Sequence, residues 1–130
     1  MPERISVLII DDDADLRQLF EDALSMAGFD VRHAPDGQTG LDLAQKQPPT
    51  LILLDVTMEP MSGLEVLSQL KSDDKTRQIP VFMLTGKSGS DEIALALKIG
   101  AADYLTKPVE LMKLAPILRQ KLARCSPRPK

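Results

Sequence analysis

The chain has 130 residues, of which 43% are hydrophobic and 27% are charged, with a formal net charge of −3. These values are typical of one globular domain with a packed core, and the charge gives no reason to expect binding to nucleic acid or to an anionic membrane. No apolar run reaches the roughly 20 residues of a membrane span. The single cysteine, Cys125, has no partner for an internal disulfide, so we expect a cytoplasmic protein.

Strand-like apolar runs alternate with helical patterns five times along the chain. The predicted strands are Ser6–Ile10, Asp30–His33, Leu51–Leu54, Val81–Leu84 and Ala102–Leu105. The first, third and fourth are almost entirely apolar, which is typical of strands covered on both faces in a parallel sheet. The alternation therefore predicts an α/β fold with a doubly wound open sheet.

The helical patterns carry recognisable end signals. In the first, apolar residues recur three and four apart, with Asp13 as predicted N-cap and Gly28 as predicted stop. The third begins at the capping-box pair Ser62 and Glu65. The fifth contains Pro116, which predicts a kink or a late start. The second, fourth and fifth patterns cover about Asp36–Lys46, Asp91–Gly100 and the leucines from Leu111 to Leu122.

Polar side chains follow four of the predicted strands. Asp11 and Asp12 follow the first strand, Asp55 the third, Thr85 the fourth and Lys107 the fifth. A parallel sheet brings these ends to one edge, where doubly wound folds bind ligands. Carboxylates held close together need a cation or a proton, and hard oxygen ligands that leave room for water suit Mg²⁺. Together with a lysine and a hydroxyl, such a site favours phosphoryl transfer, with an aspartate as nucleophile.

Each of these residues also has an ordinary interpretation. A single aspartate at a strand end is more often a helix cap, which is our interpretation of Asp13. Threonine is common in strands, and Lys107 alone would be read as a surface lysine. The prediction of a site depends on their joint placement at successive strand ends.

Four stretches together resemble the receiver domain of bacterial two-component response regulators. They are VLIIDDDADLR, LILLDVTMEPMSGLEVL, IPVFMLTGKS and GAADYLTKPVELMKL. The resemblance runs from Ile5 to about Leu122. It implies a flavodoxin-like (βα)5 sandwich, with a five-stranded parallel sheet of order 2-1-3-4-5 and helices on both faces. It also implies a receiver domain over residues 1–124, followed by a polar, proline-containing tail or linker start over residues 125–130.

The resemblance assigns roles to matching residues. Asp55 would be the phosphoacceptor, taking a phosphoryl group from a sensor histidine kinase or a phosphotransfer protein. Asp11, Asp12, Asp55 and the backbone carbonyl of Thr57 would hold Mg²⁺, with Mn²⁺ as a substitute. Apart from its own phosphorylation and dephosphorylation, the domain would not be an enzyme.

The resemblance also implies a switch. Thr85 and Lys107 would contact phosphoryl oxygens, and the Lys107–Pro108 peptide would be cis. Tyr104 would swing between outward and inward rotamers as Thr85 moves. This motion would change the face made by the fourth helix, fifth strand and fifth helix, where a downstream effector docks. A homodimer through the fourth and fifth helices stays open, as does whether the receiver stands alone or continues beyond Cys125.

The loops that follow Asp55 and Thr85 depart from the family or carry residues with a further role in it. The family usually has proline four residues after the acceptor, but this sequence has Glu59 there and Pro60 one residue later, while Gly63 keeps its expected place. We expect Glu59 to point to solvent. In the family, residues at the positions of Thr57 and Lys87 tune the lifetime of the phosphorylated state.

Two other functions fit parts of the sequence. A Mg²⁺-dependent phosphohydrolase of the haloacid dehalogenase type would need Thr or Val where Asp15 stands, and it gives no role to Asp55. A receiver-like binding module that signals without phosphorylation conflicts with the complete residue set, although Glu59 keeps it open. His33, the only histidine, is interpreted as a surface or edge residue.

Overall fold

The computed structural model describes residues 4–86 and 90–125, in which five strands alternate with five helices. The strands are β1 (Ser6–Ile10), β2 (Asp30–Ala34), β3 (Leu51–Asp55), β4 (Val81–Thr85) and β5 (Asp103–Thr106). The helices are α1 (Ala14–Met26), α2 (Gly37–Lys46), α3 (Gly63–Ser72), α4 (Ser90–Ile99) and α5 (Leu111–Cys125).

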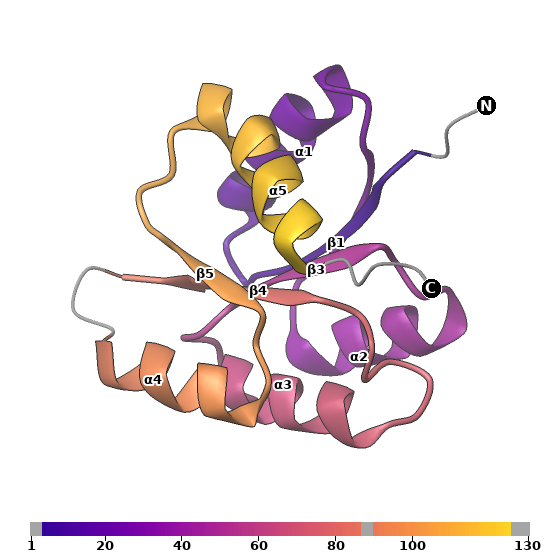
Figure 1. The fold of residues 1–130 in the computed structure, drawn as a ribbon, viewed down its shortest axis with the longest axis vertical. Coiled ribbons are helices and arrows are strands. Elements are labelled where there is room, and N and C mark those ends of the chain that lie inside the picture. The colour runs from indigo at the N-terminus through magenta and orange to yellow at the C-terminus, as the bar shows by residue number, and fades with distance from the viewer. Residues whose placement is uncertain (1–3, 87–89, 126–130) are drawn as a thin grey trace.

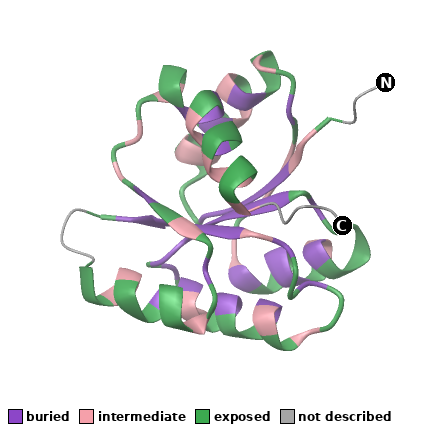
Figure 2. Ribbon diagram, viewed as in Figure 1, coloured by how far each residue is buried: buried purple, intermediate pink, exposed green. Residues whose placement is uncertain are grey.

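All strand pairs are parallel, and the sheet order is β2-β1-β3-β4-β5. Helices α1 and α5 cover one face of the sheet, and α2, α3 and α4 cover the other (Figure 1). Alternate residues of β1 enter the two cores, Val7 and Ile9 on the α1 side and Leu8 and Ile10 on the α2 side. Because both faces are covered, β3 and β4 are buried along their whole length (Figure 2). The predicted doubly wound fold is confirmed.

The predicted helix caps agree with the structure. The Asp13 side chain accepts from the Leu16 amide at 3.1 Å, and Ser62 and Glu65 form the capping box of α3. Gly28 follows α1 with φ +95°, a backbone conformation that is unfavourable for residues with a side chain. Several predicted bounds are off by one residue. Strands β2, β3 and β4 end one residue later than predicted, β5 and α4 are shifted by one residue, and Asp36 caps α2 instead of lying within it.

Pro116 predicted either a kink or a late start of the fifth helix. The late start is wrong, because α5 begins at Leu111 and Pro116 lies inside it, and the kink stays a prediction. The amide that Pro116 lacks would bond to the carbonyl of Met112. Met112 is 94% exposed, so the missing bond lies on the solvent-facing side of α5. The predicted tail over residues 125–130 lies outside the described residues except for Cys125, the last residue of α5. Within the described part, no helix is both long and apolar enough to cross a membrane.

Candidate functional site

Three carboxylates meet at the carboxyl edge of the sheet. Asp11, Asp12 and Asp55 each place an oxygen within 4.8 Å of the others. The cause is the register of adjacent parallel strands, in which Ile10 of β1 pairs with Leu54 of β3. The residues after these two positions therefore leave the sheet side by side, as the sequence predicted.

Asp11 is the most buried of the three, with none of its surface exposed. Its Oδ1 accepts from the Asp13 amide at 2.9 Å, whereas its buried Oδ2 has no hydrogen-bond donor within the described part of the chain. Burial raises the pKa of Asp11, and the Asp13 amide offsets part of this effect while the Asp55 charge adds to it. Burial thus removes the water that would otherwise solvate this oxygen of the ionised form.

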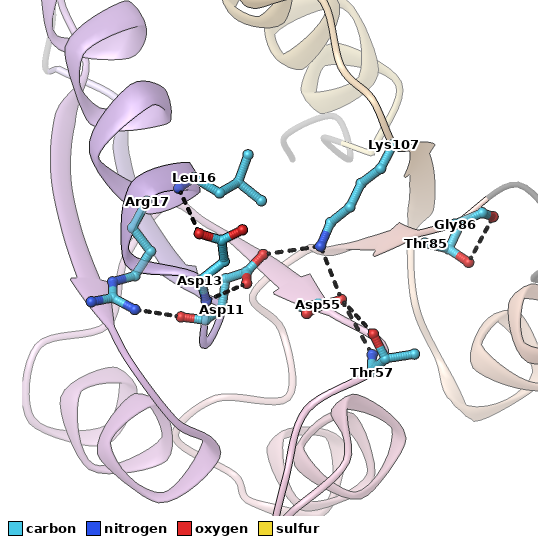
Figure 3. A network of polar contacts seen from close by, with 9 residues as sticks. All are labelled: Asp11, Asp13, Leu16, Arg17, Asp55, Thr57, Thr85, Gly86 and Lys107. Atoms are coloured by element: carbon cyan, nitrogen blue, oxygen red, sulfur yellow. Dashed lines mark hydrogen bonds and ion pairs between the residues drawn. The ribbon is translucent and has the colours of Figure 1, made fainter.

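Asp55 is held from two sides. Its Oδ1 accepts from the Thr57 amide at 3.2 Å and from the Thr57 hydroxyl at 3.4 Å, and the Lys107 ammonium lies 3.4 Å away (Figure 3). Behind it, α3 begins at Gly63, where an added Cβ would lie 2.0 Å from the Asp55 carbonyl oxygen. The close approach of α3 therefore requires glycine and fixes the backbone under the Asp55 carboxylate.

Lys107 bridges two of the carboxylates. It follows β5, and its Nζ lies 3.3 Å from Asp11 Oδ2 and 3.4 Å from Asp55 Oδ1. Burial alone would lower the pKa of the Lys107 ammonium, but the charges of Asp11 and Asp55 outweigh burial and raise it. The peptide between Lys107 and Pro108 is cis, as expected. Lys107 is thus a fixed positive charge at neutral pH.

Thr85 and Tyr104 lie in the predicted elements but are not joined to this cluster. The Thr85 side chain is buried at the end of β4, and its hydroxyl donates to the Gly86 carbonyl at 3.4 Å. Figure 3 shows it apart from the carboxylates, and among the described residues no hydrogen bond joins it to Asp55. Tyr104, on the edge strand β5, is 39% exposed.

The chemistry of these groups fits a hard divalent cation. Three carboxylates supply only oxygen ligands, which Mg²⁺ prefers. The buried Asp11 Oδ2, which lacks a hydrogen-bond donor, would gain a partner if a cation were bound. Asp12 is exposed, so the site is open to solvent on that side. The described residues can therefore hold a cation at this edge.

The loop after β3 carries Glu59 and Pro60 close to the site. Glu59 is exposed, as expected, and the peptide between Glu59 and Pro60 is also cis. Lys87 lies outside the described residues.

Sequence reasoning missed the amide and hydroxyl contacts of Thr57 with Asp55. It also gave no role to Arg17, whose guanidinium donates to the Asp11 carbonyl at 2.8 Å. The position of Arg17 one turn into α1, just after the acidic residues, was the available signal.

Comparisons with known proteins agree on one family. A model of the response regulator receiver domain matches residues 7–119. The chain is 38% identical to the phosphate regulon transcriptional regulatory protein PhoB of Pseudomonas aeruginosa, over 94% of this chain and 53% of that protein. It is 40% identical to the response regulator MprA of Mycobacterium sp. (strain KMS), over 98% of this chain and 54% of that protein. The chain thus spans about half the length of these relatives.

Solved structures show the same relationship. Chemotaxis protein CheY4 of Vibrio cholerae superposes with a TM-score of 0.85 at 30% identity, covering 91% of this chain and 98% of that one. The receiver domain of NtrX from Brucella abortus gives a TM-score of 0.82 at 28% identity, covering 90% and 98%. Both likenesses extend over nearly the whole described fold.

Proposed function

The chain belongs to the response regulator receiver domain family of two-component systems, and we propose that it is a phosphorylation switch with Asp55 as phosphoacceptor. The observation that carries this proposal is the placement of Asp55 beside Lys107 and within 4.8 Å of two other carboxylates. Asp55 is the member of the cluster that a lysine, an amide and a hydroxyl all approach.

We assign the cation site to Asp11, Asp12, Asp55 and the backbone carbonyl of Thr57, with Mg²⁺ as the cation and Mn²⁺ as a substitute. When bound, the cation would neutralise negative charge on the phosphoryl oxygens and on the carboxylates. This assignment rests on the all-oxygen ligand set and on the buried Asp11 Oδ2 without a donor.

The protein groups supply orientation and charge. An Asp55 carboxylate oxygen forms the bond to phosphorus while the bond from phosphorus to the donor nitrogen breaks. Lys107, already between Asp11 and Asp55, would pair with a phosphoryl oxygen. Thr57 holds the carboxylate through its amide and hydroxyl, which restricts its rotation.

The switch would run through Thr85 and Tyr104. The Thr85 hydroxyl makes only a long bond, 3.4 Å, to the Gly86 carbonyl, so a phosphoryl oxygen on Asp55 can compete for it. Tyr104 is partly exposed, and its strand partner in register is Met83, two residues before Thr85. Movement of Thr85 would therefore free space for the ring and change the face formed by α4, β5 and α5.

The partner we propose is a sensor histidine kinase or a phosphotransfer protein in the cytoplasm, with the effector unnamed. An apolar groove of about 660 Å³ runs beside Lys107, and Leu16, Leu19 and Phe20 are among its lining residues. Such a groove suits docking of a protein donor. Leu19→Asp should slow transfer from a phosphorylated histidine protein but not from acetyl phosphate; equal slowing with both donors would contradict docking here.

Incubation with acetyl phosphate and Mg²⁺, followed by intact mass, tests the function. A switch gains one phosphoryl group per chain and does not turn over phosphomonoesters. Repeated turnover of a small phosphomonoester would favour the hydrolase instead. No gain of mass would favour a phosphorylation-independent binding module.

A further inference from the structure

Arg17 connects the acidic site to the edge of the sheet. It lies on α1, half-buried, and its guanidinium NH1 donates to the backbone carbonyl of Asp11 at 2.8 Å (Figure 3). That carbonyl belongs to the first residue after β1, where the chain turns away from the sheet toward α1. A short bond from a charged donor holds a peptide plane firmly.

The other side of the guanidinium is held as well. Its Nε donates to Nδ1 of His33 at 3.1 Å, and His33 Nε2 lies 2.8 Å from Glu21 Oε1. Because an arginine N–H points at Nδ1, that nitrogen has no hydrogen, and Nε2–H donates to the Glu21 carboxylate. His33 belongs to β2, in register with Ile9 of β1. Arg17 therefore spans from β2 to the loop after β1.

The peptide that Arg17 holds determines where two carboxylates point. The Asp11 amide donates to the Ala34 carbonyl at 3.2 Å, so this residue is fixed to β2 on its amide side and to Arg17 on its carbonyl side. The Asp12 backbone follows directly from the same peptide. A tilt of this peptide would move both Asp11 and Asp12 relative to Asp55.

We propose that Arg17 is a positioning residue for the cation site, and that His33 acts through Arg17. This inference rests on the proposed function, because it takes Asp11 and Asp12 as ligands. Arg17 itself would touch neither the cation nor the phosphoryl group, since its bonds go to a carbonyl and an imidazole.

The sign of one substitution separates positioning from simple electrostatics. Arg17→Met removes a positive charge near a divalent cation. If the charge alone mattered, the loss of its repulsion would make Mg²⁺ bind more tightly. Loss of positioning would make Mg²⁺ bind more weakly, by roughly tenfold, as for other groups that orient metal ligands. Arg32→Met is the control, because Arg32 lies on β2 next to His33 but its guanidinium bonds to Gln47 and not to the acidic site.

The experiment measures the Mg²⁺ dissociation constant by calorimetry for wild type, Arg17→Met, Arg32→Met, His33→Phe and the Arg17→Met/His33→Phe double variant. We expect weaker binding for Arg17→Met, little change for Arg32→Met, and a smaller weakening for His33→Phe that disappears in the double variant. Unchanged or tighter binding in Arg17→Met overturns the proposal. An effect of His33→Phe that persists without Arg17 overturns the role of His33.

A second variant and a phosphorylation measurement complete the test. Urea denaturation checks whether Arg17→Met folds, and Arg17→Lys replaces it if it does not. The single ammonium of the lysine keeps the positive charge but cannot bond to the carbonyl and the imidazole together, so we expect weaker Mg²⁺ binding. At saturating Mg²⁺ the folded variant should still be phosphorylated by acetyl phosphate. Failure of wild type to bind Mg²⁺ would instead contradict the proposed function.

Discussion

The Lys107 ammonium nitrogen lies 3.3 Å from Oδ2 of Asp11, an oxygen with no exposed surface and no hydrogen-bond donor within the described residues. Lys107 and Asp11 therefore form an ion pair in which Oδ2 accepts no hydrogen bond. Since Lys107 is 31% exposed while Asp11 is fully buried, the cost of the buried carboxylate is only partly offset. The site is an arrangement that a bound cation would stabilise.

The first prediction concerns the stability of the metal-free protein. The pKa of Asp11 is raised above its ordinary value of 3.8, chiefly by burial. Below pH 3.8 the group is protonated in both states and costs nothing, and the cost develops as pH rises from there through the raised pKa. Asp11→Asn should therefore raise the free energy of unfolding at neutral pH by roughly 1–3 kcal/mol, and by nothing below pH 3.8.

Urea denaturation in EDTA across pH measures this difference. Asp12→Asn is the control, because it removes the same charge from an exposed position and should change stability by less than about 0.5 kcal/mol. A destabilised Asp11→Asn at neutral pH would show that burial of the ionised Asp11 carboxylate does not lower the stability of the metal-free protein.

Mg²⁺ should stabilise the folded chain. A cation that binds only the folded state adds about 2.7 kcal/mol at a concentration one hundred times its dissociation constant. Asp11→Asn should lose most of this gain, since it removes a buried ligand oxygen. Thermal unfolding with MgCl₂, against NaCl of equal ionic strength, provides the measurement; equal stabilisation by both salts would argue against a specific site.

Gly63→Ala should disrupt the support of Asp55. The added Cβ would lie 2.0 Å from the Asp55 carbonyl oxygen and 2.8 Å from Val56 Cα, both backbone atoms. Overpacking of this kind costs roughly 1–3 kcal/mol or more. Gly86→Ala is the control, because its Cβ would meet nothing within 4 Å. Equal denaturation midpoints for the two variants would mean that α3 can shift freely.

Thr85→Val should separate phosphorylation from its readout. Tyr104 is the only tyrosine and the chain has no tryptophan, so intrinsic fluorescence reports on this ring alone. We expect phosphorylation to change the fluorescence of wild type and of the control Thr106→Val, but not of Thr85→Val, which retains the shape and loses the hydroxyl. A full fluorescence change in phosphorylated Thr85→Val would rule out the threonine hydroxyl as the link.

The sequence predicted the fold because the signals were local and consistent. Apolar strands ending in polar residues, the Asp13 cap and the Ser62–Glu65 box each follow from short-range chemistry. The convergence of Asp11, Asp12 and Asp55 also followed, because parallel strand ends must share an edge.

Other features depend on distances that no pattern reveals. The burial of Asp11 Oδ2 without a donor, and the reach of Arg17 to both the Asp11 carbonyl and His33, come from how α1 packs beside β2. Of the two outcomes predicted from Pro116, the late start of α5 is wrong, because the helix continues through the proline at an exposed turn. The phosphoryl and switch roles of Thr85 and Tyr104 stay predictions.

The most direct test of the account is to locate the phosphoryl group after incubation with acetyl phosphate and Mg²⁺. Intact mass should show one added group on wild type and none on Asp55→Asn, and peptide mapping after borohydride reduction should place the modification at Asp55. A phosphoryl group retained by Asp55→Asn, or found on another residue of wild type, would contradict the central claim.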